Sequence, residues 1–311
     1  MMKKALVLGA SGGMGSALVE ELLEAGIEVV AFARTEEKLK RLFRRRAQIL
    51  VGDVFSEADL HEAAKGVDVI FHAVNIPYYQ WAGHQLRLMQ NVINASEKAA
   101  SKLVIVDNIY AYGPGMGTLI KEDAPKVPLT KKGNIRLEVE NLVREAQVPW
   151  MIAHFPDFYG PNAEHTVLGQ TLQGAAANKR GIFIGDKRKP REYIYTPDGA
   201  KALLSLAIRP SAYGQTWNIP GAGVISGEEI IRLLKGESGY DKRVITVTKG
   251  MVRMLGLFDK MMREFVEMMY LYEQPVVLSG AKFEREIGPV PTTSYKDGIG
   301  RTMEAMAGHR S

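Results

Sequence analysis

Three glycines near the amino terminus have the spacing of a phosphate-binding turn. Gly9, Gly12 and Gly15 follow the apolar run 5–8 and precede apolar residues at helical spacing. Glycine at these places permits a tight turn, lets the backbone approach a pyrophosphate, and lets helix and strand pack closely. The free N–H groups at the helix start favour an anion. The pattern predicts a dinucleotide-binding turn, and the alternative is a glycine-rich turn that binds no ligand.

The end of the next predicted strand, residues 27–33, bears on which dinucleotide is bound. Arg34 and Thr35 follow that strand, and no carboxylate occurs before Glu36. An acidic side chain at this place would hydrogen-bond the 2′-hydroxyl of the ribose, whereas a basic one accommodates a 2′-phosphate. We therefore predict NADP in preference to NAD. The alternative is that Arg34 is only a solvated residue at a strand end.

Other cofactor contacts are expected around the same edge. Asp53 and Val54 follow the predicted strand 47–51, where a carboxylate suits an adenine pocket, although Asp53 also suits the cap of the next turn and both roles can coexist. The remaining residues that we expect to line the cofactor lie in the glycine turn or at strand ends: Ser11, Met14, Ala73, Asn75 and Phe155.

These residues need a framework of alternating strands and helices. Predicted strands are uniformly apolar, which is typical of a parallel sheet covered on both faces. The strands are expected at 5–8, 27–33, 47–51, 67–74, 102–106 and 150–155, and further helices at 36–43, 56–65, 81–100 and 134–147. We therefore predict a doubly wound α/β fold in residues 1–155. Residues 156–311, where glycine and proline become frequent, form a smaller lobe, and part of it near 193–208 returns to the first domain.

Composition excludes several classes of protein. The 311 residues carry a net charge of +5, with 46% hydrophobic and 24% charged residues, as in ordinary globular proteins. This charge is too dilute for a nucleic-acid binder. Cysteine is absent, the six histidines lack helical metal-ligand spacing, and no apolar run reaches about 18 residues. We expect a cytoplasmic protein with a small-molecule substrate, without a metal, nucleic-acid or membrane partner, and we leave a homodimer open.

Several motifs in order resemble the extended short-chain dehydrogenase/reductase superfamily, of the NAD(P)-dependent epimerase/dehydratase type. The resemblance covers nearly the whole chain and implies a Rossmann domain with a C-terminal substrate-binding lobe. Residues 107–113 match a segment that usually reads Ser-Ser-x-x-Val-Tyr-Gly. The other matching segments are 9–15, 52–54, 155–161, 191–198 and 216–219.

The catalytic residues that this resemblance implies are replaced. Members of the superfamily use a helical Tyr-x-x-x-Lys pair and a Ser or Thr after the fifth strand. Here Lys132 takes the tyrosine position, Arg136 the lysine position and Asn108 the serine position. We expect Arg136 to hold ribose hydroxyls, one helical turn from Lys132. Lys132 is either an acid with a lowered pKa or, as we favour, a solvated cation at a helix start.

The missing phenol has several candidate replacements. Tyr110 lies beside Asn108, and Tyr78, Tyr79 and Tyr112 are nearby alternatives, each of which also suits a pocket wall. The sequence thus predicts an NADP-dependent oxidoreductase or epimerase/dehydratase-like enzyme with a rebuilt active site and an unidentified small polar substrate. The alternative is an NADP(H)-binding sensor or regulatory protein with little or no turnover.

Three further features lie outside the cofactor motifs. The resemblance implies that Arg191 contacts an anionic substrate, and the alternative is an ion pair with Glu192 or Asp198. His154 lies on a predicted buried strand, which favours a satisfied core histidine. Apolar residues at helical spacing in 251–272 favour a core or an interface over a lid.

Overall fold

A seven-stranded parallel sheet forms the centre of the molecule, whose computed structural model describes residues 2–308. The strand order is β11-β7-β5-β4-β1-β2-β3, so the order reverses between β1 and β4. This arrangement confirms the predicted doubly wound α/β fold. The strands are β1 (Lys4–Leu8), β2 (Glu28–Ala33), β3 (Gln48–Val51), β4 (Val69–His72), β5 (Lys102–Asn108), β7 (Trp150–Phe155) and β11 (Gln215–Asn218).

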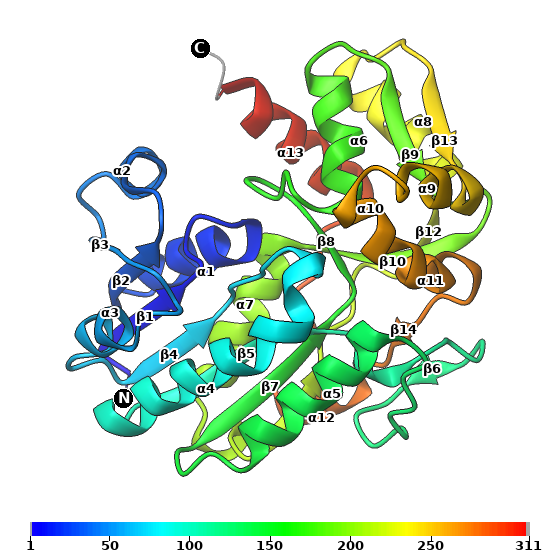
Figure 1. Cartoon of the computed structure of the whole chain (residues 1–311). Helices are drawn as coiled ribbons and strands as arrows, with labels where there is room; N and C mark the ends of the chain where they lie inside the picture. The colour runs from blue at the N-terminus through cyan, green and yellow to red at the C-terminus, as the bar shows by residue number, and fades with distance from the viewer. Residues whose placement is uncertain (1, 309–311) are drawn as a thin grey trace.

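Helices cover both faces of this sheet (Figure 1). One hydrophobic core joins the sheet to α1, α2 and α7, and a second core joins its other face to α3, α4 and α5. Alternate residues of β1 belong to different cores, Ala5 and Val7 to the first and Leu6 and Leu8 to the second. These helices are α1 (Gly13–Glu24), α2 (Glu36–Phe43), α3 (Glu57–Ala63), α4 (Trp81–Ala99), α5 (Lys131–Arg144) and α7 (Thr196–Ala207).

Capping side chains decide where two of these helices begin. Ser56 accepts a hydrogen bond from the Asp59 backbone N–H at 3.3 Å, as expected for the start of α3. Helix α5 begins three residues earlier than predicted, because Thr130 Oγ1 accepts from the Gly133 N–H at 3.0 Å. Lys132 therefore lies in the first turn of a regular helix.

The second half of the chain contributes to two places. Helix α7 packs against α1, and β11 pairs in parallel with β7, so both belong to the central layers. The remaining elements of the second half, together with β6 from the first half, form small sheets and short helices. These elements are β6 (Leu119–Ile120), β8 (Asp157–Tyr159), β9 (Gly181–Ile184), β10 (Pro190–Tyr195), β12 (Val224–Ser226), β13 (Val244–Val247), β14 (Val277–Leu278), α6 (Val167–Ala176), α8 (Gly227–Ser238), α12 (Ala281–Glu286) and α13 (Tyr295–Gly308).

The segment 249–273 is a series of short helices. It contains α9 (Lys249–Leu255), α10 (Lys260–Phe265), a 3₁₀ turn at Val266–Met269 and α11 (Tyr270–Glu273). Asp259 caps the start of α10, because its side chain accepts a hydrogen bond from the Met262 N–H at 2.8 Å, and it separates this helix from α9. The second half of the segment 249–273 supplies buried apolar side chains, as predicted. Residues 254–258 of the same segment are largely exposed. Within residues 2–308, no helix has the length and apolarity to cross a membrane.

Candidate active site

The glycine turn lies at the carboxyl end of β1, beside the point where the strand order reverses. Gly9 has a φ of +82°, and a Cβ atom there would lie 2.7 Å from the Ala73 carbonyl oxygen. A Cβ atom at Gly15 would lie 2.1 Å from the Gly9 carbonyl oxygen. Both positions thus require glycine because backbone segments approach each other closely.

Gly12 differs from the other two glycines because it is exposed. It occupies the N-cap position of α1, where no side chain hydrogen-bonds the first turn. A Cβ atom at Gly12 would meet only the Gly9 carbonyl oxygen, at 3.4 Å. The amino end of α1 therefore offers unpaired backbone N–H groups and open space, which fit the pyrophosphate of a dinucleotide.

The residues expected around the adenosine half lie at the ends of β2 and β3. Arg34 is exposed, and no described acidic side chain forms an ion pair with it. Asp53 Oδ1 accepts a hydrogen bond from the Phe55 N–H at 3.0 Å, so the expected turn-capping role is present. Val54 is 8% exposed and packs in the second core.

The other predicted cofactor residues differ in how much surface they offer. Ser11 and Ala73 are half-buried, and Asn75 is exposed. Met14 is 4% exposed, and Phe155 is fully buried in the first core, with its ring centroid 5.5 Å from that of Phe158. Packing between the sheet and its helices leaves the Phe155 side chain no accessible surface, and the expectation that this residue contacts the cofactor stays a prediction.

Arg136 lies inside the protein at the carboxyl end of β5. Its side chain extends from α5, and Nη1 lies 3.4 Å from Asp107 Oδ1. The guanidinium carbon lies 4.6 Å from the centroid of the Trp81 ring. Arg136 Nε and Asp107 Oδ2 are buried without hydrogen-bond partners among the described residues. The structure therefore brings a buried cation and unused polar atoms to the place where we expected a ribose contact.

Lys132 is buried, which corrects our preferred interpretation of it as a solvated cation. Only 2% of its side chain is exposed. Its ammonium group contacts the Glu264 carboxylate and lies 2.6 Å from Glu267 Oε1. Both glutamates belong to the segment 249–273, which folds over the start of α5. The charge of Lys132 is thus compensated within the protein.

Two tyrosines form a hydrogen-bonded pair between Arg136 and Lys132. The hydroxyl oxygens of Tyr78 and Tyr110 lie 2.6 Å apart. Burial raises the pKa of both phenols above its ordinary value, so both are neutral at pH 7. The Phe265 ring stacks parallel to the Tyr78 ring with centroids 6.2 Å apart. The pair thus provides a proton donor in a largely desolvated setting.

Asn108 shapes the turn that carries Tyr110. Its Oδ1 accepts a hydrogen bond from the Tyr110 N–H at 3.0 Å. This bond engages the oxygen of the residue that we expected in the role of the serine hydroxyl. The Asn108 amide nitrogen forms no hydrogen bond among the described residues, so it is free to contact a ligand.

A buried polar network lies beneath this site. His154 Nε2 lies 3.1 Å from Glu140 Oε1 and 3.1 Å from Lys126 Nζ. Although burial opposes ionisation, the hydrogen bond from His154 and the nearby Lys126 lower the pKa of Glu140 to about 2. Asp107, Glu140 and His154 place ligand atoms within 4.8 Å of one another, as a metal site requires. The Lys126 ammonium contacts the same carboxylate. His154 Nδ1 lies 3.3 Å from the Tyr112 hydroxyl, so both ring nitrogens have partners and His154 is a satisfied core histidine, as expected.

Arg191 lies on the other side of the candidate site. It is buried and pairs with Asp157, and its guanidinium carbon lies 3.8 Å from the centroid of the Tyr272 ring. The pairing with Glu192 or Asp198 that we weighed is wrong. The Glu192 carboxylate instead accepts backbone hydrogen bonds, and Asp198 accepts from Thr293.

Sequence reasoning missed four residues of this site. Asp107 ends a buried parallel strand, and that position was a signal for a functional carboxylate. Trp81, Glu264 and Glu267 had no such signal. The two glutamates are more than 130 residues from Lys132 in sequence, so only the fold brings them there.

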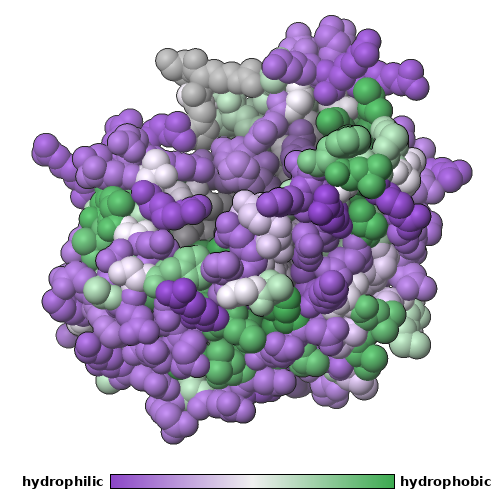
Figure 2. Space-filling view, in the orientation of Figure 1, coloured by the Kyte–Doolittle hydropathy of each residue, from purple (hydrophilic) through white to green (hydrophobic). Residues whose placement is uncertain are grey.

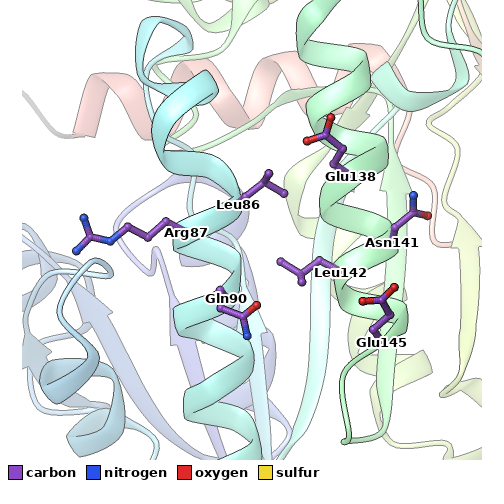
Figure 3. Close-up of a pocket in the computed structure, with 7 residues that line it drawn as sticks. All are labelled: Leu86, Arg87, Gln90, Glu138, Asn141, Leu142 and Glu145. Carbon is purple, nitrogen blue, oxygen red and sulfur yellow. The ribbon is translucent and has the colours of Figure 1, made fainter.

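A separate surface groove lies between α4 and α5 (Figure 3). Its volume is ≈ 520 Å³, and Leu86 and Leu142 point toward each other across it. None of the predicted cofactor or catalytic residues lines this groove. It is lined by Leu86, Arg87, Gln90, Glu138, Asn141, Leu142 and Glu145.

Comparison with known proteins identifies a family and a fold. A family model described as NAD(P)H-binding matches residues 9–179. A protein described as an uncharacterized UDP-glucose epimerase, from Bacillus subtilis, is 29% identical over 265 residues, which cover 76% of this chain and 82% of the relative. An NAD(P)H azoreductase from Xenophilus azovorans is 24% identical over 78% of this chain and 77% of its own length.

Solved structures with the same fold are epimerases and dehydratases of the extended short-chain dehydrogenase/reductase type. The UDP-glucose 4-epimerase from Thermotoga maritima, solved with UDP-glucose, has a TM-score of 0.80 at 19% identity and covers 99% of this chain and 100% of its own. The UDP-glucuronic acid 4-epimerase from Bacillus cereus, in complex with NAD, has a TM-score of 0.79 at 20% identity and the same coverage. At these identities the likeness concerns the fold.

Proposed function

Because this chain belongs to the NAD(P)H-binding family, we propose that it is an NADP-dependent oxidoreductase or epimerase/dehydratase-like enzyme with a rebuilt active site. Its substrate would be a small polar molecule, in line with the sugar-nucleotide enzymes among its relatives. The observation that carries the proposal is the group formed by Arg136, Tyr110 and Tyr78. Arg136 is buried and the two tyrosines are half-buried, and the three side chains converge at the carboxyl edge of the sheet, beyond the glycine turn.

The preference for NADP rests in this proposal on Arg34. An exposed guanidinium without an ion-pair partner at the end of β2 suits a 2′-phosphate. We expect Arg34→Ala to weaken NADPH binding about 10- to 150-fold, the effect of losing a hydrogen bond to a charged group. NADH binding should change little. Calorimetric titration of both cofactors tests this, and equal affinities in the unmodified protein would contradict it.

The proposed chemistry divides the work between two side chains. The glycine turn and Arg136 would hold a nicotinamide cofactor, which would supply hydride chemistry at this edge of the sheet. Arg136 orients the adjacent ribose, and the Tyr110 phenol donates a proton to the substrate oxygen. The Tyr78 hydroxyl, 2.6 Å from that of Tyr110, is placed to pass its proton to the Tyr110 phenolate, and Tyr78, which is partly exposed, would then take up a proton from solvent. Trp81 and Phe265 exclude water from the pair.

A set of tyrosine variants tests the assignment of the proton donor. NADPH oxidation would be followed with a panel of carbonyl compounds and nucleotide sugars. We expect Tyr110→Phe to lower turnover by about 10²- to 10⁴-fold, with unchanged NADPH affinity. Tyr79→Phe is the matched control, because Tyr79 is 50% exposed and lies outside the pair. Equal turnover in Tyr110→Phe and the control would contradict the assignment of Tyr110 as the proton donor.

One observation favours the alternative, an NADP(H)-binding sensor with little turnover. The segment 249–273 places Glu264 and Glu267 on Lys132 and stacks Phe265 on Tyr78, which covers the substrate side of the site. A sensor would bind NADPH without consuming it in the presence of any member of the panel. Its bound cofactor would instead change how fast a protease cuts the covering segment.

A further inference from the structure

The turn between α9 and α10 exposes consecutive large apolar side chains. The exposed fractions are 60% for Met254, 46% for Leu255, 69% for Leu257 and 89% for Phe258. Figure 2 shows hydrophobic residues gathered over α9 and α10, at the upper right of the visible face. We call residues 254–258 the apolar tip. A contiguous apolar surface of this kind marks an interaction site in a soluble domain.

Basic side chains are frequent in the chain segment that carries the apolar tip, although Lys242 pairs with Asp241 and Lys249 pairs with Glu273. Residues 242–263 contain six basic side chains and one acidic side chain, Asp259, whose carboxylate caps α10. These 22 residues thus carry the equivalent of the whole chain's net charge of +5. The six basic residues are Lys242, Arg243, Lys249, Arg253, Lys260 and Arg263.

A basic groove continues this surface along β9 and β13. Its volume is ≈ 540 Å³, and Arg180, Lys187 and Arg243 line it with no acidic side chain. None of these three forms an ion pair with another residue in the described part of the chain. Ile182 and Ile245 pair across the two strands and are 43% and 40% exposed. The groove therefore combines cationic side chains with exposed apolar ones.

We propose that the apolar tip and the basic groove dock this protein on the surface of a membrane that contains anionic lipids. Leu257 and Phe258 would enter the boundary between headgroups and acyl chains. Arginine and lysine side chains around them would contact the lipid phosphates. A surface contact requires no spanning helix, so it revises our expectation of no membrane partner, which considered only spanning segments. The proposal is independent of the proposed function.

The same charges disfavour a second copy of the chain as the occupant. A two-fold contact through this surface would bring the basic side chains of both copies into the same interface. Like charges would then face one another in a desolvated interface, which is costly. An acidic protein would match the charge, but the most exposed apolar side chains, Leu257 and Phe258, lie on a turn, which suits insertion into a lipid surface.

Vesicle co-sedimentation of the full-length protein tests the apolar tip. The probes are vesicles of phosphatidylcholine, with and without about a third of phosphatidylglycerol. We expect at least tenfold tighter binding to the anionic vesicles, because each basic residue near the surface contributes about fivefold. Leu257→Ser with Phe258→Ser should weaken that binding at least tenfold. Ile208→Ser, at a side chain 55% exposed at the end of α7, should not change it.

A second pair of variants tests the basic groove. Arg180→Ser with Arg243→Ser should weaken anionic-vesicle binding about tenfold or more, whereas Arg41→Ser with Arg45→Ser, which removes the same charge at α2, should leave it unchanged. Binding should also weaken as salt is raised.

Four outcomes would overturn the proposal: no binding to anionic vesicles, equal binding to neutral vesicles, equal loss in both double arginine variants, or stronger binding to polyglutamate than to vesicles. A dimer seen by ultracentrifugation that Phe258→Ser disperses, together with no vesicle binding, would identify a second copy as the occupant instead.

Discussion

The candidate site has two regions that are built in different ways: the glycine turn, which is expected to bind the cofactor, and the side chains around Arg136, where the reaction is expected to occur. The glycine turn is a single run of seven residues whose function depends on backbone N–H groups and on the lack of side chains. The group around Arg136 combines side chains from β5, α4, α5, the turn before α4 and the segment 249–273. A turn that binds its ligand through backbone N–H groups therefore tolerates few substitutions. A group of side chains from separate elements can instead be rebuilt with new partners.

Lys132 illustrates how far that rebuilding extends. In the related enzymes the resemblance places a tyrosine at this position, near the nicotinamide. Here the position holds a buried cation whose two carboxylate partners come from the covering segment. The replacement therefore couples the start of α5 to the second lobe. The proton donor that we propose instead is Tyr110, which is held by Tyr78 and by the Asn108 turn.

The largest expected effects come from replacing two glycines of the same turn, one of which should lower stability and the other abolish NADPH binding. Gly15→Val would force a side chain against the Gly9 carbonyl oxygen, so we expect a loss of roughly 3 kcal/mol or more of unfolding free energy. Gly12→Val has space at the surface, so it should fold and yet fail to bind NADPH. Thermal unfolding with and without NADPH measures both effects. Full NADPH protection of Gly12→Val would show that the pyrophosphate does not approach this turn.

The next largest expected effect is on NADPH affinity in variants of Arg136. Arg136→Ala should weaken NADPH binding about 10- to 150-fold if the guanidinium holds the ribose. Arg136→Lys keeps the charge and restores the residue type of the related enzymes, so it should recover much of that affinity. Calorimetry on variants whose folding has been checked by circular dichroism gives the answer. Unchanged affinity in Arg136→Ala would mean that α5 does not contact the cofactor.

A buried histidine provides a smaller effect that depends on pH. Burial, with a smaller contribution from Arg136, lowers the pKa of His72 to about 3, whereas the unfolded chain titrates near 6.5. The unfolded state therefore binds more protons between these values, so stability falls as the pH drops below about 6.5. We expect a loss of about 2–3 kcal/mol by pH 4.5.

Urea unfolding at a series of pH values tests this dependence. His72→Asn should make the pH profile shallower than that of the unmodified protein, while the exposed control His84→Asn should leave it unchanged. Parallel profiles for His72→Asn and the unmodified protein would contradict the assignment.

The smallest expected effect is a difference in how strongly the two carboxylate partners of Lys132 hold the segment 249–273. Glu267 is the more buried and also accepts a hydrogen bond from the Lys131 N–H at 2.9 Å, whereas the Glu264 side chain is 36% exposed. Solvent screens the more exposed pair. Glu267→Gln should therefore loosen the segment 249–273 more than Glu264→Gln, each by about 1 kcal/mol or less. Rates of limited proteolysis within 249–263 measure this, and the reverse order would refute it.

Sequence patterns were sufficient for the strands, the glycine turn and the parallel sheet. Apolar runs of strand length, separated by amphipathic helices, leave few other ways to cover both faces, and the positions of Gly9 and Gly15 follow from local geometry. The patterns were misleading where a contact partner is distant. The apolar spacing in 251–272 was compatible with one helix, yet Asp259 starts a new one and leaves Phe258 exposed.

The sequence by itself therefore determined the α/β framework and the turn suited to a dinucleotide, because both depend on residues adjacent in the chain. Only the tertiary structure decided that Lys132 is buried between Glu264 and Glu267, that Arg136 meets Asp107, and that Phe155 belongs to the core. Burial and charge compensation are properties of side chains brought together from separate elements. No local pattern encodes them, since the free energy of each charge depends on which distant groups surround it.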